Sequence, residues 1–341
     1  MTGGGAEPGA DEPPVGAPSA ARVPAAGWRS AVPLTRLVVV LAVIVVMFVV
    51  AVTVAVVAAP PSEDDLLKQA GMTGKRELLV GVKDDQPGVA MLDETGRYTG
   101  FDIDIAYMIA SDLGFRPSEV RFLSLESEDR ERMQAVDPRS HENVTVDIVV
   151  ASFSITRKRI DEGVNFSAPY LITEQSVVTR KDHRDVEALA DLAGEKVCTI
   201  GTSTSAIQLQ QAGIKDMQGP KKISTCMERL IKRECDAVTT DAAILAGFMH
   251  APPYRGLLKH HDIALEAQES WGVNVGKNKA LQTLVNLSLY RSWHDPGDRR
   301  WEDAYDRNLR VEQPDSPHQQ VAVETQPEPD RPAVRRWPWQ S

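Results

Sequence analysis

The sequence lacks the short motifs that mark most enzyme and metal sites. It contains no G-x-S-x-G elbow, no P-loop and no G-x-G-x-x-G turn after a strand. Its seven histidines show no H-E-x-x-H spacing, and its three cysteines form no C-x-x-C pair. With 38 Lys+Arg against 48 Asp+Glu, it also lacks the basic excess that nucleic-acid binding needs. We therefore expect no catalytic centre, metal, cofactor or nucleic-acid partner.

Proline is concentrated at the two ends of the chain. Of 22 prolines, six fall within residues 1–36 and six within residues 312–341. Neither end shows a helix or strand period, so neither can bury enough apolar surface to offset the entropy of ordering. We expect a disordered segment over 1–36, a linker over 60–75 and a disordered tail over 312–341. Trp337, Pro338 and Trp339 leave open a docking peptide within that tail.

Residues 37–59 are 23 consecutive residues without a charge. A helix of this length reaches roughly 35 Å, enough to cross a hydrocarbon core of about 30 Å. The competing interpretation is a cleaved signal peptide, whose apolar region is normally about 7–15 residues long. Arginines precede the span and acids follow it, so the positive-inside rule predicts a single-pass membrane protein with residues 1–36 in the cytoplasm and the rest outside.

Apolar patterns divide the body of the chain into alternating strands and helices. Over residues 100–114, apolar side chains recur on one helical face, with Asp102 as the expected N-cap. Twice, a buried strand leads through a polar turn into a helix, at 197–213 and at 235–249. Further strands are predicted at 76–82 and 145–151. This alternation indicates an α/β fold with mostly parallel sheets.

Polar turns at the ends of these strands are candidate binding positions. Residues 201–205 (GTSTS) place hydroxyls and free backbone N–H groups at a helix N-terminus, which suits an anion, although a simple helix cap by Thr202 or Ser203 is the alternative. Residues 152–159 (SFSITRKR) supply hydroxyls and cations after another strand. Asp241 either receives an ammonium group or caps the helix that follows it.

Together these segments resemble a known family over about residues 76–311. The run GFDIDIAYMIASDL is similar to the motif of the extracellular solute-binding proteins, family 3, which bind polar amino acids for ABC importers. The order of GVKDDQPG, VDIVVASFSITRKRI, NFSAPY, VCTIGTSTS, CDAVTTDAAILAGF and WGVNVGKN agrees with that family. The opening segment and two of the cysteines look most like its actinobacterial glutamate-binding branch. Asp84 departs from the pattern, because this branch usually has an aromatic residue there.

The resemblance implies a type II periplasmic-binding-protein fold with two α/β lobes and a hinge. Lobe 1 would be residues 76–178 plus 270–311, and lobe 2 residues 179–269. It further implies a Cys198–Cys226 disulfide with Cys235 reduced, whereas the residues alone leave three free thiols open.

The resemblance also implies a set of ligand-binding residues. Arg159 would hold the α-carboxylate of an amino acid as a bidentate fork, and Asp241 would accept its ammonium. The other implied ligand-binding residues are Lys83, Asp85, Ser152, Ser154, Thr202, Ser203 and Thr204.

The expected function is a membrane-anchored extracellular receptor for a glutamate-like amino acid. It would serve either an ABC permease or a membrane signalling partner through ligand-induced lobe closure. Two alternatives remain at this stage: a ligand-free scaffold of the same fold, and a dehydratase-like enzyme, which would need a general acid or base in the cleft.

Overall fold

The computed structural model describes residues 34–263 and 268–335, and it divides the chain into two units, residues 1–59 and 60–341. In the first unit, helix α1 (Leu34–Ala58) begins three residues before the predicted span and ends one residue before its end. A segment of it, Leu34–Val54, has a mean hydropathy of 3.4. By length and composition it is apolar enough to cross a membrane.

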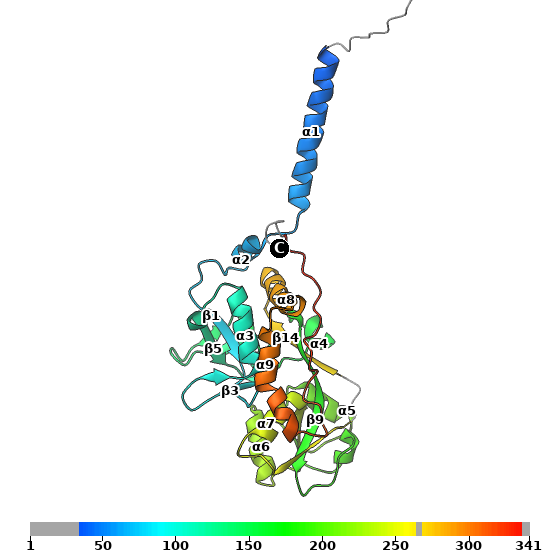
Figure 1. Ribbon diagram of the computed structural model, residues 1–341. Helices are drawn as coiled ribbons and strands as arrows, with labels where there is room; N and C mark the ends of the chain where they lie inside the picture. Colours follow the sequence, from blue (N-terminus) through cyan, green and yellow to red (C-terminus); the bar gives the residue numbers. More distant parts are fainter. Residues whose placement is uncertain (1–33, 264–267, 336–341) are drawn as a thin grey trace, which may run out of the picture. The chain divides into compact units, whose positions relative to one another are not determined.

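The second unit contains one large sheet, two small sheets and eight α-helices among its described residues (Figure 1). The large sheet consists of β1 (Leu78–Val82), β5 (Val120–Ser124), β8 (Ile148–Val149), β9 (Phe166–Arg180), β10 (Val197–Cys198), β11 (Met217–Gln218), β12 (Ala237–Asp241), β13 (Leu258–His261) and β14 (Gln268–Asn274). The small sheets consist of β2 (Asp85–Gln86), β3 (Ala90–Leu92) and β4 (Tyr98–Thr99), and of β6 (Gln134–Val136) and β7 (Asn143–Thr145). The helices are α2 (Glu63–Gln69), α3 (Phe101–Asp112), α4 (Arg157–Asp161), α5 (Thr204–Gln211), α6 (Ile223–Ile231), α7 (Ala242–His250), α8 (Lys279–His294) and α9 (Arg300–Asn308).

Strand β9 joins two halves of the large sheet. The strand order is β11, β10, β12, β9, β14, β8, β1 and β5, and β13 also pairs with β9. The first half-sheet (β14, β8, β1, β5) pairs with β9 as far as Glu174, and the second half-sheet (β10, β11, β12, β13) pairs with it from Gln175 onward. The pairs β1–β5, β1–β8, β10–β11 and β10–β12 are parallel. Away from the crossing strands β9 and β14, the strand pairs of both halves are therefore parallel. This agrees with the α/β prediction of mostly parallel strands.

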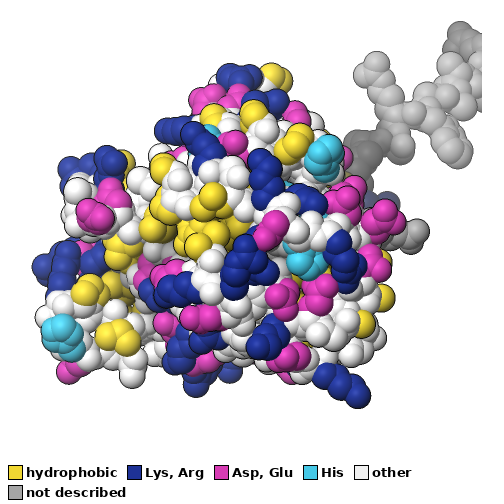
Figure 2. Space-filling view, turned by 90° about the horizontal axis from the view of Figure 1, so that it is seen from below, with side chains coloured by type: hydrophobic (Ala, Val, Ile, Leu, Met, Phe, Trp, Pro, Cys, Tyr) yellow, Lys and Arg dark blue, Asp and Glu magenta, His cyan; other side chains and the backbone are white. Residues whose placement is uncertain are grey.

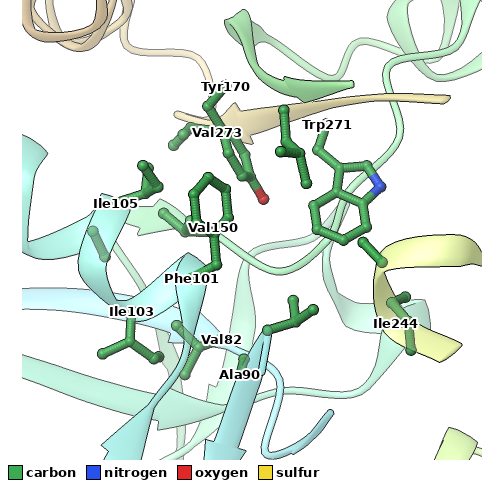
Figure 3. Close-up of a cluster of buried hydrophobic side chains, with 14 of the residues drawn as sticks. Val82, Ala90, Phe101, Ile103, Ile105, Val150, Tyr170, Ile244, Trp271 and Val273 are labelled. Atoms are coloured by element: carbon green, nitrogen blue, oxygen red, sulfur yellow. The ribbon is translucent and has the colours of Figure 1, made fainter. Parts of the chain in front are cut away.

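Aromatic and aliphatic side chains pack together in the core beside the crossing strands (Figure 3). Phe101 at the start of α3 packs edge-on to Trp301 of α9, with ring centroids 5.8 Å apart. The Trp301 Nε1–H donates to the Tyr170 carbonyl at 2.7 Å, so this buried indole leaves no unpaired donor. Because burying a large apolar side chain contributes about 1.5–3 kcal/mol, this cluster fixes α3 and α9 against the first half-sheet.

Two segments expected to lack structure are folded. The predicted linker over 60–75 contains α2, whose Leu66 is buried and whose Glu63 forms an ion pair with Arg291 of α8 at 2.5 Å. The predicted tail over 312–341 was wrong for residues 312–335, which pack on the body and bury Val321 and Ala322 in the core. Two apolar residues and a series of hydrogen bonds anchor this segment, although it has no periodicity that the sequence could display. The Trp337, Pro338 and Trp339 cluster lies outside the described residues, as do residues 1–33.

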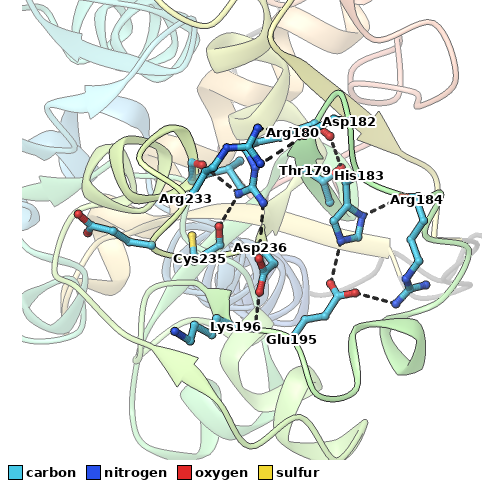
Figure 4. A network of polar contacts seen from close by, with 12 residues as sticks. Thr179, Arg180, Asp182, His183, Arg184, Glu195, Lys196, Arg233, Cys235 and Asp236 are labelled. Atoms are coloured by element: carbon cyan, nitrogen blue, oxygen red, sulfur yellow. Dashed lines mark hydrogen bonds and ion pairs between the residues drawn. The ribbon is translucent and has the colours of Figure 1, made fainter.

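The cysteine prediction is confirmed. Cys198 at the end of β10 is bonded to Cys226 on α6, and Cys235 is a buried free thiol. The Cys235 carbonyl accepts a hydrogen bond from Arg180 Nη1 at 2.6 Å, within a network that also contains Asp236 and His183 (Figure 4). Burial raises the pKa of the Cys235 thiol to about 11, so it stays protonated at neutral pH.

Charged side chains of both signs are interspersed on the surface of the body. Figure 2 shows lysines and arginines beside aspartates and glutamates around a patch of hydrophobic side chains. Such mixing favours short-range ion pairs over a long-range field of one sign.

Candidate functional site

Asp241 is buried at the end of β12, where α7 begins. It occupies the N-cap position, but its side chain makes no capping hydrogen bond. Instead its Oδ2 accepts from the Trp271 Nε1–H of β14 at 2.5 Å, and only 4% of the residue is exposed. Burial, together with the nearby charge of Glu269, raises the pKa of Asp241 to about 8. The alternative in which the Asp241 side chain caps α7 is therefore wrong.

Arg159 lies on the short helix α4, whose N-cap Thr156 accepts from the Arg159 backbone N–H at 3.3 Å. Its Nη1 donates to the Ser154 carbonyl at 2.7 Å, and its Nη2 lies 3.5 Å from the Thr202 carbonyl. The guanidinium carbon lies 4.5 Å from the centroid of the Phe153 ring. Burial lowers the pKa of Arg159. The side chain thus reaches from the first half-sheet toward the turn that follows β10 in the second.

Ser154 links these two charged residues through its backbone. It forms an isolated antiparallel bridge with Trp271, whose indole binds Asp241, while its carbonyl binds Arg159. Of the residues predicted from the sequence, the structure therefore brings Ser154, Arg159, Thr202 and Asp241 together.

Arg130 was missed by the sequence analysis. It is 6% exposed, and its Nη1 donates to the Ala151 and Ser152 carbonyls at 3.2 and 3.0 Å. Its guanidinium carbon lies 4.7 Å from the same Phe153 ring that Arg159 contacts. Burial, and repulsion from Arg159, lower the pKa of Arg130 to about 9. Nothing in the charged stretch 124–143 marks this arginine as buried, so only the tertiary structure identifies it.

Asp102 positions Ser152. The Ser152 backbone has a φ of 42°, an uncommon value for a residue other than glycine. Its N–H donates to Asp102 Oδ2 at 2.8 Å, and the Tyr170 hydroxyl donates to Asp102 Oδ1 at 2.8 Å. Burial raises the pKa of Asp102 to about 7. The prediction of Asp102 as a helix cap was wrong, because Gly100 is the N-cap and the carboxyl holds the segment after β8 instead.

The turn at residues 201–205 begins α5. Ser203 is the N-cap, and its Oγ accepts from the Ala206 N–H at 3.1 Å, so its hydroxyl performs the capping role. Thr202 and Thr204 line a cavity of about 300 Å³ that also borders Arg159. Three acidic residues of the first half, Glu131, Glu162 and Glu269, line the same cavity. This cavity is bordered by both halves of the sheet.

Lys83 and Asp85 are engaged with other parts of the protein. Lys83 is 1% exposed, its Nζ donates to the Leu125 carbonyl at 3.3 Å, and burial lowers its pKa. Asp85 Oδ2 accepts from the Ser224 N–H of α6 at 3.1 Å. Next to it, Asp84 binds Lys222 at 2.8 Å. The two aspartates thus connect the loop after β1 to α6, and the assignment of Lys83 and Asp85 to the ligand stays a prediction.

Two half-sheets joined by crossing strands, with an arginine and an aspartate buried near the crossing, define a binding protein of the type II periplasmic-binding-protein fold. Residues 78–307 match the bacterial extracellular solute-binding proteins, family 3, and the chain belongs to this family. Over 226 residues it is 31% identical to the glutamate-binding protein GluB of Corynebacterium glutamicum, covering 63% of this chain and 74% of that protein. The predicted family and fold class are confirmed.

Solved structures share the fold. An ancestral arginine-binding protein bound to glutamine is 28% identical, with a TM-score of 0.58 over 69% of this chain and 98% of its own. A solute receptor for L-cysteine of Neisseria gonorrhoeae is 23% identical, with a TM-score of 0.62 over 72% of this chain and 94% of its own. Proteins of this fold therefore take amino acids with quite different side chains, so the side-chain specificity has to be argued from the residues of the site.

Proposed function

We propose that this protein is a membrane-anchored extracellular receptor that binds a glutamate-like amino acid between its two lobes. The observation that carries the proposal is the position of Arg159 and Asp241. Both are buried, one is a guanidinium and the other a carboxyl group, and they lie in different halves of the sheet near the crossing of β9 and β14. A zwitterionic amino acid has the two complementary charges at its α-carbon, and pairing them offsets the cost of burying both side chains.

Each contact in the proposed complex has a chemical reason. Arg159 presents a planar fork that matches a carboxylate, and the hydroxyls of Ser152 and Ser154 lie on the adjacent segment. The backbone N–H groups of Thr202 to Thr204 lie at the N-terminus of α5, where an anion is favoured. Asp241 accepts the ammonium. Because contacts to the two lobes form together only when the lobes close, the ligand stabilises the closed state.

The second guanidinium favours an acidic side chain on the ligand. Arg130 and Arg159 both contact the Phe153 ring, and the charge of Arg159, after burial, lowers the pKa of Arg130. A ligand with a second carboxylate would relieve this repulsion, as expected for a relative of a glutamate-binding protein. Glu131 and Glu269 favour the competing choice, a cationic amino acid such as arginine. A direct comparison of glutamate, glutamine and arginine separates these choices.

The membrane role is proposed from α1 and its flanks. Arg36 lies at the start of the helix, and Glu63, Asp64 and Asp65 follow it, which favours residues 1–36 in the cytoplasm and the binding domain outside. The partner would be an ABC permease or a membrane signalling protein that recognises the closed lobes.

The test is calorimetry and thermal unfolding of the full chain in detergent, against the twenty amino acids. A ligand at 100 times its Kd should add about 2.7 kcal/mol of stability. Arg159→Lys should weaken binding by roughly 2 kcal/mol or more, because a lysine cannot form the fork. Arg157→Lys, two residues away and largely exposed, is the matched control and should bind normally.

The outcomes separate the alternatives. No shift with any amino acid would favour the scaffold interpretation. Full affinity in both Arg159→Lys and Asp241→Asn would show that the ligand lies elsewhere.

A further inference from the structure

The segment over residues 312–335, called the strap here, lies beyond the part of the chain that matches the family, which ends at residue 307. Figure 1 shows it passing along β9 and α8 toward α2. Its hydrogen bonds follow the same route. They reach the second half-sheet first, then β9, then α8, and finally the residues just before α2.

Strand β9 crosses between the two half-sheets and is called the hinge strand here. The strap contacts it on both sides of the position where it changes partner. Gln319 binds Ser176 Oγ through its Oε1 at 3.0 Å, and its Nε2 binds Glu174 Oε1. Ser176 lies on the side that pairs with the second half-sheet, and Glu174 on the side that pairs with the first. One glutamine side chain therefore spans the hinge, so bending β9 between these residues must disturb the strap.

Strap residues on both sides of Gln319 make further hydrogen bonds to the two halves of the sheet. The Val323 N–H donates to the Ile172 carbonyl at 2.8 Å, and the Thr173 hydroxyl donates to the Val321 carbonyl at 2.8 Å. On the other side, Ser316 Oγ lies 2.9 Å from His260 Nδ1 of β13 in the second half-sheet.

Glu312, the first residue of the strap, lies where the two lobes meet. A side chain at Gly88, in the turn between β2 and β3, would overlap the Glu312 carboxyl, and φ at Gly88 is +73°. Gly247 of α7 packs against the same place, because a Cβ there would overlap the Pro87 carbonyl and lie 3.3 Å from Glu312 Oε1. Glu312 is 2% exposed. Movement of α7 relative to the Gly88 turn would therefore move this end of the strap.

The far end of the strap contacts residues 61–65, called the neck here. The Arg335 N–H donates to the Pro61 carbonyl at 3.0 Å, and the Arg335 guanidinium binds Asp65 Oδ2 at 3.4 Å. Asp65 and Ser62 form the capping box that starts α2. Pro61 follows Ala58, the last residue of α1, by three positions. On the way, Gln326 Nε2 donates to the Leu289 carbonyl of α8 at 2.9 Å.

We infer that the strap couples the hinge to the neck, so that opening or closing of the lobes changes the hydrogen bonding at residues 61–65, next in sequence to the membrane helix. This rests on the proposed function, because ligand-driven closure supplies the motion. The mechanical reason is that the strap is held at four places along one continuous backbone: the second half-sheet, β9, α8 and the neck. A displacement of the strap at the hinge strand is therefore transmitted along its backbone to the neck.

The test uses the full chain in detergent, with a protease site inserted between the exposed residues Glu324 and Thr325. Cleavage after folding separates the hinge part of the strap from the neck part. The readout is amide hydrogen exchange in peptides that cover the neck. The contact between the lobes is perturbed in two ways: by saturating L-glutamate, and by Lys222→Glu, which places two acids at the Lys222–Asp84 contact between α6 and the loop after β1. Lys232→Glu, which faces Glu228 on its own helix, is the matched control.

Before cleavage, we expect glutamate to slow neck exchange and Lys222→Glu to speed it, each by about threefold or more. After cleavage, both responses should fall below about twofold while glutamate still binds. Gln319→Ala should reduce the response without cutting the chain, whereas the exposed Gln320→Ala should not. A neck that responds equally after cleavage, or that responds to neither perturbation in the uncut protein, would overturn the inference.

The two proposals fail in different ways. If glutamate has no effect but Lys222→Glu alters the neck only in the uncut chain, the strap coupling holds and the ligand assignment fails. If calorimetry shows glutamate binding but the neck never responds, the ligand assignment holds and the coupling fails.

Discussion

Replacing Asp241 by asparagine should stabilise the ligand-free protein while weakening its binding of an amino acid. Asp241 is 4% exposed, and its pKa rises from 3.8 to about 8, first because of burial and then because of Glu269. Folding therefore takes up a proton at this carboxyl between about pH 4 and pH 8, so the free energy of unfolding falls as the pH rises through that interval. Asparagine has no proton to take up.

The magnitude follows from the shift. At pH 7 the carboxyl is ionised in the unfolded chain and mostly protonated in the folded protein. The interval between pH 7 and the unfolded pKa is about three units at about 1.4 kcal/mol each, so the raised pKa costs the folded state roughly 4 kcal/mol relative to an unshifted carboxyl. This is an upper limit for the gain in Asp241→Asn, since the new amide N–H₂ group also needs hydrogen-bond partners. The Trp271 indole can still donate to the asparagine Oδ1. We expect a gain of about 1–3 kcal/mol near pH 8 and almost none near pH 4.

The assay is urea unfolding of the ligand-free variant and wild type at several pH values. Asp216→Asn, a change at an exposed aspartate, is the control and should shift stability by less than about 0.5 kcal/mol at every pH. A stability difference that does not grow with pH would refute the argument. The affinity for the amino acid should change in the opposite direction to the stability, because the ammonium needs the ionised carboxylate. Wild-type affinity should rise as the pH approaches 8. The Asp241→Asn variant should lose this pH dependence.

Three further predictions concern other parts of the chain. Removing the disulfide with Cys198→Ser and Cys226→Ser, whose partners are 28 residues apart, should lower the free energy of unfolding by about 3.6 kcal/mol on the chain-entropy model; a loss under about 1 kcal/mol in urea unfolding would contradict it. Arg130→Met should lower the preference for glutamate over glutamine by at least about tenfold in calorimetry, because the second carboxylate loses its cation; an unchanged ratio would remove Arg130 from the ligand. Protease added to intact cells should leave a fragment with the N-terminus and α1, and soluble protein that begins near Pro60 would show instead that the span is cleaved.

Most of the fold could be predicted because its signals are local. The strand, turn and helix sequence at residues 235–249 became β12 and α7, and the helix predicted over 100–114 became α3. The lengths were less predictable. The strand expected over 145–151 is divided between two sheets, because Thr145 belongs to β7 of a small sheet and Ile148 and Val149 form β8 of the large sheet. The strap could not be predicted, since its order comes from contacts with β9 and α8 that lie far away in the sequence.

The candidate site could be predicted from the sequence where a motif supplied its residues, and could not be predicted where tertiary packing determines the contacts. The motif pointed to Arg159 and Asp241, and the structure places both at the crossing strands. It said nothing about Trp271 as the partner of Asp241, because that contact depends on how β14 crosses β9. Asp102 was misassigned since an acid at a helix start has the same local pattern whether it caps the helix or is buried beneath the next loop.

The buried charges around the crossing strands explain why an amino acid is the ligand that fits. The pKa of Arg130 and Arg159 is lowered and that of Asp241 is raised, so each group is held in a place that disfavours its charged form. Such groups reduce stability, and hydrophobic replacements would often be neutral or better for folding alone. In the proposed complex, a ligand that carries a carboxylate for the arginines and an ammonium for Asp241 would reverse all three pKa shifts. Its binding energy would then include the relief of a cost already present in the folded protein, and that relief would be available only when both lobes contact the same molecule. On this proposal, the groups that weaken the unliganded protein would make closure depend on the ligand.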